Sequence, residues 1–149
     1  MARVLDKQQI LDSITNLAQL DIDAWHAYGQ AIDRIDQPII RERLLIFQED
    51  HHNHILNLSD KIRELGGTPP EFSRDFKGYL LEGFTALRSV TGTEGALKAM
   101  QSNERTTNKK YSQALEPELP ADVRALLEMN YADEKRHLAY VEEQLKKFS

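Results

Sequence analysis

A glutamate and a histidine near the end of the chain, Glu134 and His137, have types and a spacing suited to binding a metal ion. Residues three apart lie on one face of a helix, so a carboxylate oxygen and an imidazole nitrogen can reach the same point. Apolar residues recur around this pair at helical spacing between Val123 and Phe148, which is typical of a helix face turned toward a core. A buried carboxylate beside a buried imidazole needs partners. We therefore expect other helices to supply them.

Acids or imidazoles interrupt the apolar face of each predicted long helix. One such residue of each helix lies 14 to 16 residues along the chain from the nearest predicted turn, near Asp36 or Glu118. At about 1.5 Å per residue this places these four residues ~22 Å from their turns, and the two remaining histidines lie three residues farther along their helices. The spacing therefore predicts that they meet in one layer of a helical bundle. The six residues are Asp21, His51, His54, Glu104, Glu134 and His137.

The helix ends are predicted from capping and turn residues. Asp6 and Gln9 form a capping pair, Asp36 is the predicted N-cap of the second helix, and Gly66-Gly67 is a C-terminal stop signal. The 149 residues are predicted to form a single domain, 1–149. Its helices are predicted over about 6–35, 37–65, 93–116 and 120–148, with a shorter helix over 72–90.

A single offset of 83 residues relates the unusual positions of the first half to those of the second. The chain is therefore predicted to contain two helical hairpins of common design. The offset maps Asp21 to Glu104, Tyr28 to Tyr111, Asp50 to Asp133, His51 to Glu134 and His54 to His137.

The six residues favour a metal site at the bundle centre. Helical bundles that bind two iron or manganese ions take one carboxylate from each of two helices and a pair three residues apart from each of the other two. Carboxylate and imidazole ligands without cysteine leave iron, manganese and zinc open. Tyr28 and Tyr111 are two turns from Asp21 and Glu104 and are predicted to hydrogen-bond ligands. The alternative is a metal-free buried polar network, in which clustered carboxylates would repel one another.

Other features limit the classes of function. His26, His52, Asp23 and Asp33 fall off the apolar faces and are predicted to lie at the surface. The net charge of −5 and the absence of a basic cluster argue against a nucleic-acid partner. No apolar run has the length of a membrane span or a signal peptide. With no cysteine, the expected location is cytoplasmic.

With these residues in place, the chain resembles the ferritin-like superfamily of di-iron carboxylate proteins, in particular small bacterial ferritin-like domains formerly labelled domains of unknown function. The resemblance covers residues 6–148. It implies an all-α, ferritin-like four-helix bundle with a long crossover that contains the extra short helix. It rests on Asp21 with Tyr28, Glu104 with Tyr111, the Glu134–His137 motif and Leu65-Gly66-Gly67-Thr68-Pro69.

The resemblance also implies roles for individual residues. Asp21 and Glu104 would be terminal carboxylates, Glu134 a bridging carboxylate, and His54 and His137 terminal imidazoles. The chain departs from the family pattern at a single ligand position, where His51 stands in place of a second bridging glutamate.

The departure at His51 changes the charge of the expected site. Two divalent ions carry four positive charges, but the apolar faces supply only three carboxylates. Asp50 is adjacent, although it is turned ~100° around the helix, and remains a possible ligand. An unusual two-metal site, a single-metal site and a site without redox chemistry all stay open.

The expected function follows from the resemblance. It is oxidation of Fe(II) by oxygen or peroxide at a site for two iron ions, with manganese or zinc as alternatives, in iron handling or stress response. The expected partners are metal ions and oxygen or peroxide, and a homodimer is possible. The rival hypothesis is a non-catalytic helical interaction module whose metal, if any, is structural.

Overall fold

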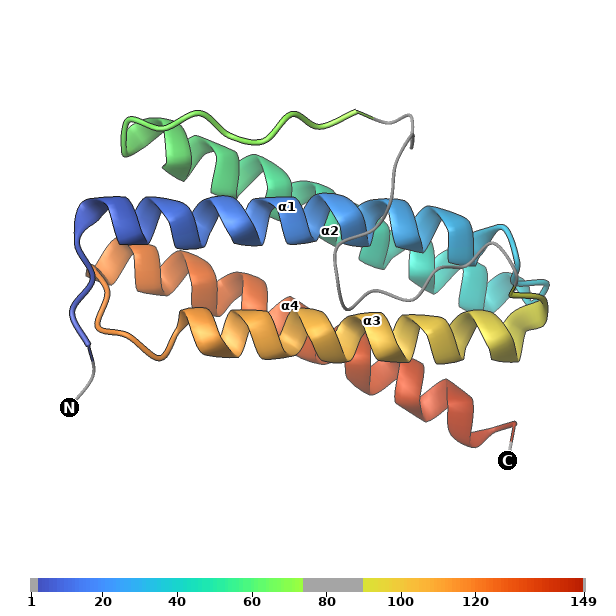
Figure 1. The fold of residues 1–149 in the computed structure, drawn as a ribbon. Coiled ribbons are helices and arrows are strands. Elements are labelled where there is room, and N and C mark those ends of the chain that lie inside the picture. The colour runs from blue at the N-terminus through green and yellow to red at the C-terminus, as the bar shows by residue number, and fades with distance from the viewer. Residues whose placement is uncertain (1–2, 74–89, 149) are drawn as a thin grey trace.

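The computed structural model describes residues 3–73 and 90–148 of the 149-residue chain, and within these ranges it contains four α-helices and no β-strand. This confirms the predicted all-α four-helix bundle (Figure 1). The predicted short helix over 72–90 falls largely outside the described residues, and residues 71–73 are not helical. The helices are α1 (Lys7–Ile32), α2 (Pro38–Glu64), α3 (Gly92–Ala114) and α4 (Ala121–Lys146).

Two of the predicted helix ends have the expected capping geometry. The Asp6 carboxylate accepts a 2.8 Å hydrogen bond from the Gln9 backbone N–H, and the Gln9 side chain accepts one of 3.0 Å from the Asp6 N–H. At the end of α2, the Gly67 N–H donates to Ile62 O at 2.9 Å, while Gly66 has a φ of +88°. That conformation strains side chains other than glycine, so Gly66 stops the helix.

The predicted N-cap of α2 is wrong. Gln37 occupies that position and makes no side-chain capping bond. The Asp36 carboxylate instead accepts a 2.8 Å hydrogen bond from the Thr93 hydroxyl at the start of α3. A tertiary partner has therefore replaced the local cap, and α1 already ends at Ile32 rather than near Ile35.

The order of the helices in space requires a long return between α2 and α3. α1 and α4 run in one direction, and α2 and α3 run in the other (Figure 1). The Asp36–Thr93 hydrogen bond joins the beginnings of α2 and α3 at one end of the bundle. At the other end, the Glu118 N–H donates to Arg3 O at 2.7 Å. The chain therefore crosses the length of the bundle between α2 and α3, as the resemblance implies.

Two buried apolar clusters fill the two ends of the bundle and leave a polar layer between them. Along every helix, the acids and imidazoles of this layer fall between residues of the two clusters. None of the helices in the described ranges is long and apolar enough to cross a membrane. One cluster includes Leu44, Phe47, Leu97, Met100 and Val141, and the other includes Ile14, Leu17, Leu58, Ile62 and Leu127.

Two residues predicted at the surface are buried. His26 is 9% exposed and Asp23 is 7% exposed, and His26 is covered by the chain that follows α2. The Phe72 ring lies 6.2 Å from that of His26 and 5.2 Å from that of Trp25, centroid to centroid. Burial lowers the pKa of His26. Asp33 is exposed, as expected, and His52 is partly exposed.

Candidate metal centre

The structure brings the six predicted residues together in the buried polar layer. All six side chains are essentially inaccessible to solvent. They form two groups of four whose potential ligand atoms lie within 4.8 Å of one another. His51 of α2 and Glu134 of α4 belong to both groups, so the layer has two overlapping centres. The first group is Asp21, His51, His54 and Glu134, and the second is His51, Glu104, Glu134 and His137.

The first group is organised around Asp21 of α1. Its Oδ1 lies 2.7 Å from Nδ1 of His51 and 3.0 Å from Nδ1 of His54. The second carboxylate of the group, Glu134, places its Oε1 3.4 Å and 3.2 Å from the same two ring nitrogens. Two carboxylates and two imidazoles from three helices thus surround one point.

The second group is organised around Glu104 of α3. Its Oε1 lies 3.3 Å from Nε2 of His51 and 3.6 Å from Nδ1 of His137. Nδ1 of His137 is also 3.6 Å from Oε2 of Glu134. Glu134 therefore directs one oxygen toward each group.

Three buried polar atoms of the layer lack a hydrogen bond within the described part of the chain: both carboxylate oxygens of Glu134 and Nδ1 of His137. Leaving a buried carboxylate without hydrogen bonds is costly, so these atoms call for a further partner. Oxygen and imidazole nitrogen without thiolate suit divalent iron, manganese or zinc. The residues present therefore fit a metal centre.

Two tyrosines link the hairpins across the layer. The Tyr28 hydroxyl of α1 donates to Oε1 of Glu104 at 2.5 Å, and the Tyr111 hydroxyl of α3 donates to Oδ2 of Asp21 at 2.6 Å. Thr107 also donates to Glu104, at 2.8 Å to Oε2. These hydrogen bonds fix the orientation of the two carboxylates that the resemblance makes terminal ligands.

Two further aspartates hold the outer nitrogens of the terminal histidines. Oδ2 of Asp50 lies 2.9 Å from Nε2 of His137, and Oδ2 of Asp133 lies 2.8 Å from Nε2 of His54. Asp50, named as a possible ligand, thus lies outside both groups of potential ligands among the described residues. Asp133 was missed as a functional residue, although the 83-residue offset pairs it with Asp50.

The histidines carry the compensating charge when no metal is bound. Burial disfavours a charge on His51, but the Glu134 charge and hydrogen bonds to Asp21 and Glu104 outweigh it and raise its pKa to about 9. The pKa of His54 is raised against its burial to about 12, chiefly by Asp21.

The pKa values of the other buried ligand candidates are also shifted by their oppositely charged neighbours. The pKa of His137 rises well above its ordinary value despite burial, because Asp50, Glu104 and Glu134 surround it. The pKa values of Asp21 and Glu104 fall despite burial, because imidazole rings face them. Metal binding to these ring nitrogens must therefore displace protons.

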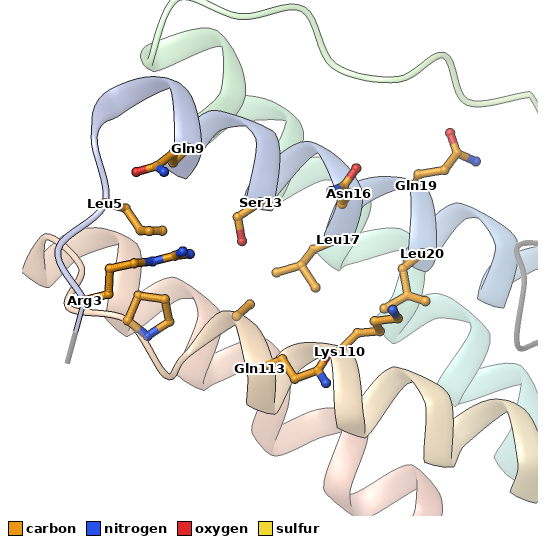
Figure 2. A pocket seen from close by; sticks show the side chains of 12 residues that line it. Arg3, Leu5, Gln9, Ser13, Asn16, Leu17, Gln19, Leu20, Lys110 and Gln113 are labelled. Atoms are coloured by element: carbon orange, nitrogen blue, oxygen red, sulfur yellow. The ribbon is translucent and has the colours of Figure 1, made fainter. Parts of the chain in front are cut away.

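A cavity of about 500 Å³ lies away from this layer, between the N-terminal part of α1 and the C-terminal part of α3 (Figure 2). Its charged lining residues are Arg3 and Lys110. No acid or histidine occurs among its lining residues, all of which the structure describes. The cavity therefore lacks ligands for a divalent cation, and the bundle interior holds the better candidate site.

Comparison with known sequences gives a family but no activity. Residues 9–117 match the family described as Domain of unknown function (DUF2383). This match includes Asp21, His51, His54 and Glu104, whereas Glu134 and His137 lie beyond it. None of the curated proteins matches the chain.

Comparison with solved structures gives the fold. A protein from Bacillus anthracis str. Ames, described as ferritin like and diiron-carboxylate, has a TM-score of 0.74 at 19% identity and covers 94% of this chain and 97% of its own. A dodecameric thioferritin from Bacteroides fragilis, described as bacterioferritin-related, has a TM-score of 0.77 at 15% identity, with coverages of 97% and 88%. The bacterioferritin of Desulfovibrio desulfuricans, described with a diiron site, has a TM-score of 0.71 at 21% identity, with coverages of 94% and 80%. The bundle is thus ferritin-like.

Proposed function

The chain belongs to the family described as Domain of unknown function (DUF2383), and from the geometry of its buried layer we propose that it binds two divalent ions, preferentially iron. We further propose that it uses them in ferroxidase or in oxygen- or peroxide-dependent oxidoreductase chemistry, in iron handling or stress response. The ferritin-like fold and the buried groups of potential ligands support iron binding.

One observation carries the proposal: two groups of potential ligands overlap in His51 and Glu134, and neither oxygen of Glu134 accepts a hydrogen bond within the described part of the chain. A polar network built only for structure would be expected to satisfy a carboxylate at its centre. From its shared position, Glu134 would hold one ion with each of its two carboxylate oxygens.

Each residue has a distinct part in the proposed site. Asp21 and His54 would hold one ion, and Glu104 and His137 the other. Bound iron would supply the one-electron redox chemistry toward oxygen or peroxide. Asp50 and Asp133 accept hydrogen bonds from the outer nitrogens of the two terminal histidines, which leaves Nδ1 of each ring facing the ions.

The surroundings of the layer support the same role. The hydroxyls of Tyr28 and Tyr111 hold one oxygen of Glu104 and one of Asp21. The two apolar clusters exclude bulk water from above and below the layer. A dry, oriented ligand set strengthens electrostatic interactions with bound cations.

The rival is a helical interaction module in which the layer is structural. The pairs His54–Asp133 and His137–Asp50 favour it, because they are satisfied without a metal. In that case a bound ion would be redox-inert and closed to further ligands.

Metal analysis and an anaerobic titration distinguish the two-ion redox site from the structural alternative. Protein purified without chelator or affinity tag should contain iron, and apo protein should take up two Fe(II) per chain. The variant His137→Ala should lose much of this binding, while His52→Ala, at a partly exposed histidine of α2, should keep it. Admission of oxygen or peroxide should then oxidise the bound Fe(II). Uptake of fewer than two ions by the natural chain would refute the two-ion site.

A further inference from the structure

We propose that His51 bridges the two ions as an imidazolate, with one ring nitrogen bound to each. This inference rests on the proposed two-ion site and assigns the residue that departs from the family pattern. It makes His51 a shared ligand in its own right rather than an imperfect substitute for glutamate.

The orientation of the ring carries the inference. Nδ1 of His51 faces the first group, at 2.7 Å from Oδ1 of Asp21 and 3.4 Å from Oε1 of Glu134. Nε2 faces the second group, at 3.3 Å from Oε1 of Glu104. The ring is fully buried between the two groups and presents a different nitrogen to each. In metal-ligating histidines the second nitrogen ordinarily bonds an outer carboxylate, a backbone carbonyl or water.

His51 differs in this respect from the other two histidines of the layer. His54 and His137 each turn Nε2 outward to an aspartate, Asp133 and Asp50, whose side chains are 24% exposed. Both nitrogens of His51 instead meet residues assigned to the ligand set. A terminal ligand needs one inward nitrogen, whereas a bridge needs two.

Charge balance supports the same assignment. Two divalent ions carry four positive charges, and Asp21, Glu104 and Glu134 supply three negative charges. The charged His51 ring of the metal-free protein has two N–H protons, and one of them is lost to solvent as each ion binds, which leaves an anionic ring that offers an electron pair from each nitrogen. The imidazolate supplies the fourth negative charge, and no electron is transferred in this step.

The bridge has a geometric consequence that a carboxylate bridge does not share. Two ions bridged by oxygen ligands in two-metal sites are ~3.5–4 Å apart. Ions on opposite nitrogens of one imidazole ring must be farther apart, because the ring lies between them. Ion separation therefore distinguishes the two kinds of bridge without any measurement of activity.

The test uses Zn(II) as a redox-inert probe of the full chain. Zinc per chain is counted by mass spectrometry, and the zinc–zinc separation and ligand atoms come from a crystal structure and from X-ray absorption in solution. The natural protein should bind two ions, each with one ring nitrogen of His51, at a separation beyond 4 Å. His51→Glu should keep two ions but bring them to ~3.5–4 Å. His51→Gln should hold each ion at least ~10-fold more weakly, and His52→Gln should match the natural protein.

Each outcome decides the inference. Two zinc ions with His51 bound to only one of them, or an unchanged separation in His51→Glu, would overturn the bridge while leaving the two-ion site intact. A single ion per chain would overturn both proposals. If the His51 variants do not fold, the zinc-loaded natural protein alone decides through its separation and ligand atoms.

Discussion

The two hairpins, α1–α2 and α3–α4, contribute to the buried polar layer through matched positions that differ at its centre. Tyr28 and Tyr111 donate to the carboxylate of the opposite hairpin, and Asp50 and Asp133 hold the histidine of the opposite hairpin. At the matched central position, one hairpin has His51 and the other has Glu134. The hydrogen bonds of the tyrosines and outer aspartates are thus reciprocal, and the largest chemical difference between the hairpins lies in the central ligands. We infer that the chemical identity of the site depends on this pair.

The largest expected effect comes from removing the charge of Glu134. Because this carboxylate directs one oxygen toward each group, Glu134→Gln should lower the affinity for both ions, each by at least ~100-fold. His51→Gln should also weaken the binding of both ions, because the ring offers one nitrogen to each group, but by less, since all three carboxylates remain. An anaerobic Fe(II) titration of both variants measures this directly. Equal losses would show that the two hairpins contribute equivalent central ligands, contrary to the comparison.

The stability of the metal-free protein provides a second contrast between the central residues. The pKa of His51 is raised from 6.5 to about 9, so the stability that its charge contributes is fully present below pH 6.5 and is lost as the pH rises through 9. This loss should be on the order of 3 kcal/mol of unfolding free energy. His51→Gln should lack it.

Urea unfolding in the presence of a chelator, from pH 4 to pH 10, measures this contrast. His51→Glu should lose stability in a more acidic pH window than the natural protein: like charges raise the pKa values of its crowded acids, so its stability should be highest at low pH and fall as these acids ionise toward neutrality. Parallel pH profiles for the natural protein and His51→Gln would show that the ring does not carry the compensating charge.

The contents of the layer were predictable because they depend on helical period. An acid or imidazole in an apolar face turns toward the core, and equal distances from a turn place such residues at one level. This reasoning identified Asp21, His51 and Glu104 without knowledge of any contact. The four-helix fold followed from the same periodicity together with turn residues such as Gly66.

Contacts made off the helix faces were not predictable in the same way. Asp133 precedes Glu134, and its turn of ~100° around the helix points it away from the apolar face. It becomes functional only because His54 of α2 packs beside it. His26 is buried by Phe72, a residue beyond the end of α2. Both depend on tertiary packing, which periodicity does not report.

The outer aspartates give a smaller and more symmetric expected effect. Asp50→Asn and Asp133→Asn each remove the carboxylate that accepts a hydrogen bond from one terminal histidine. Each substitution should therefore lower the affinity for one ion by ~10- to 100-fold. Isothermal titration with Zn(II) should show similar losses for the two variants. Asp133 also pairs with Arg136, and within the described ranges Asp50 has no matching arginine or lysine. A much larger loss of zinc affinity for one variant than for the other would show that the hairpins also differ in these outer aspartates.

The smallest expected effect concerns the tyrosines, and it tests whether the reciprocal hydrogen bonds are equivalent. Tyr28→Phe and Tyr111→Phe each remove one hydrogen bond to a charged carboxylate, which typically contributes about 1.5–3 kcal/mol. The Glu104 carboxylate keeps a hydrogen bond from Thr107, so Tyr28→Phe should be the milder change. Among the described residues, Asp21 would retain its two imidazole neighbours and no hydroxyl donor. Tyr111→Phe should therefore lower both the melting temperature of the metal-free protein and the affinity of the first ion more than Tyr28→Phe does. A larger effect of Tyr28→Phe would show that Thr107 does not compensate for the lost hydrogen bond to Glu104, and that the Tyr28 hydrogen bond matters more than that of Tyr111.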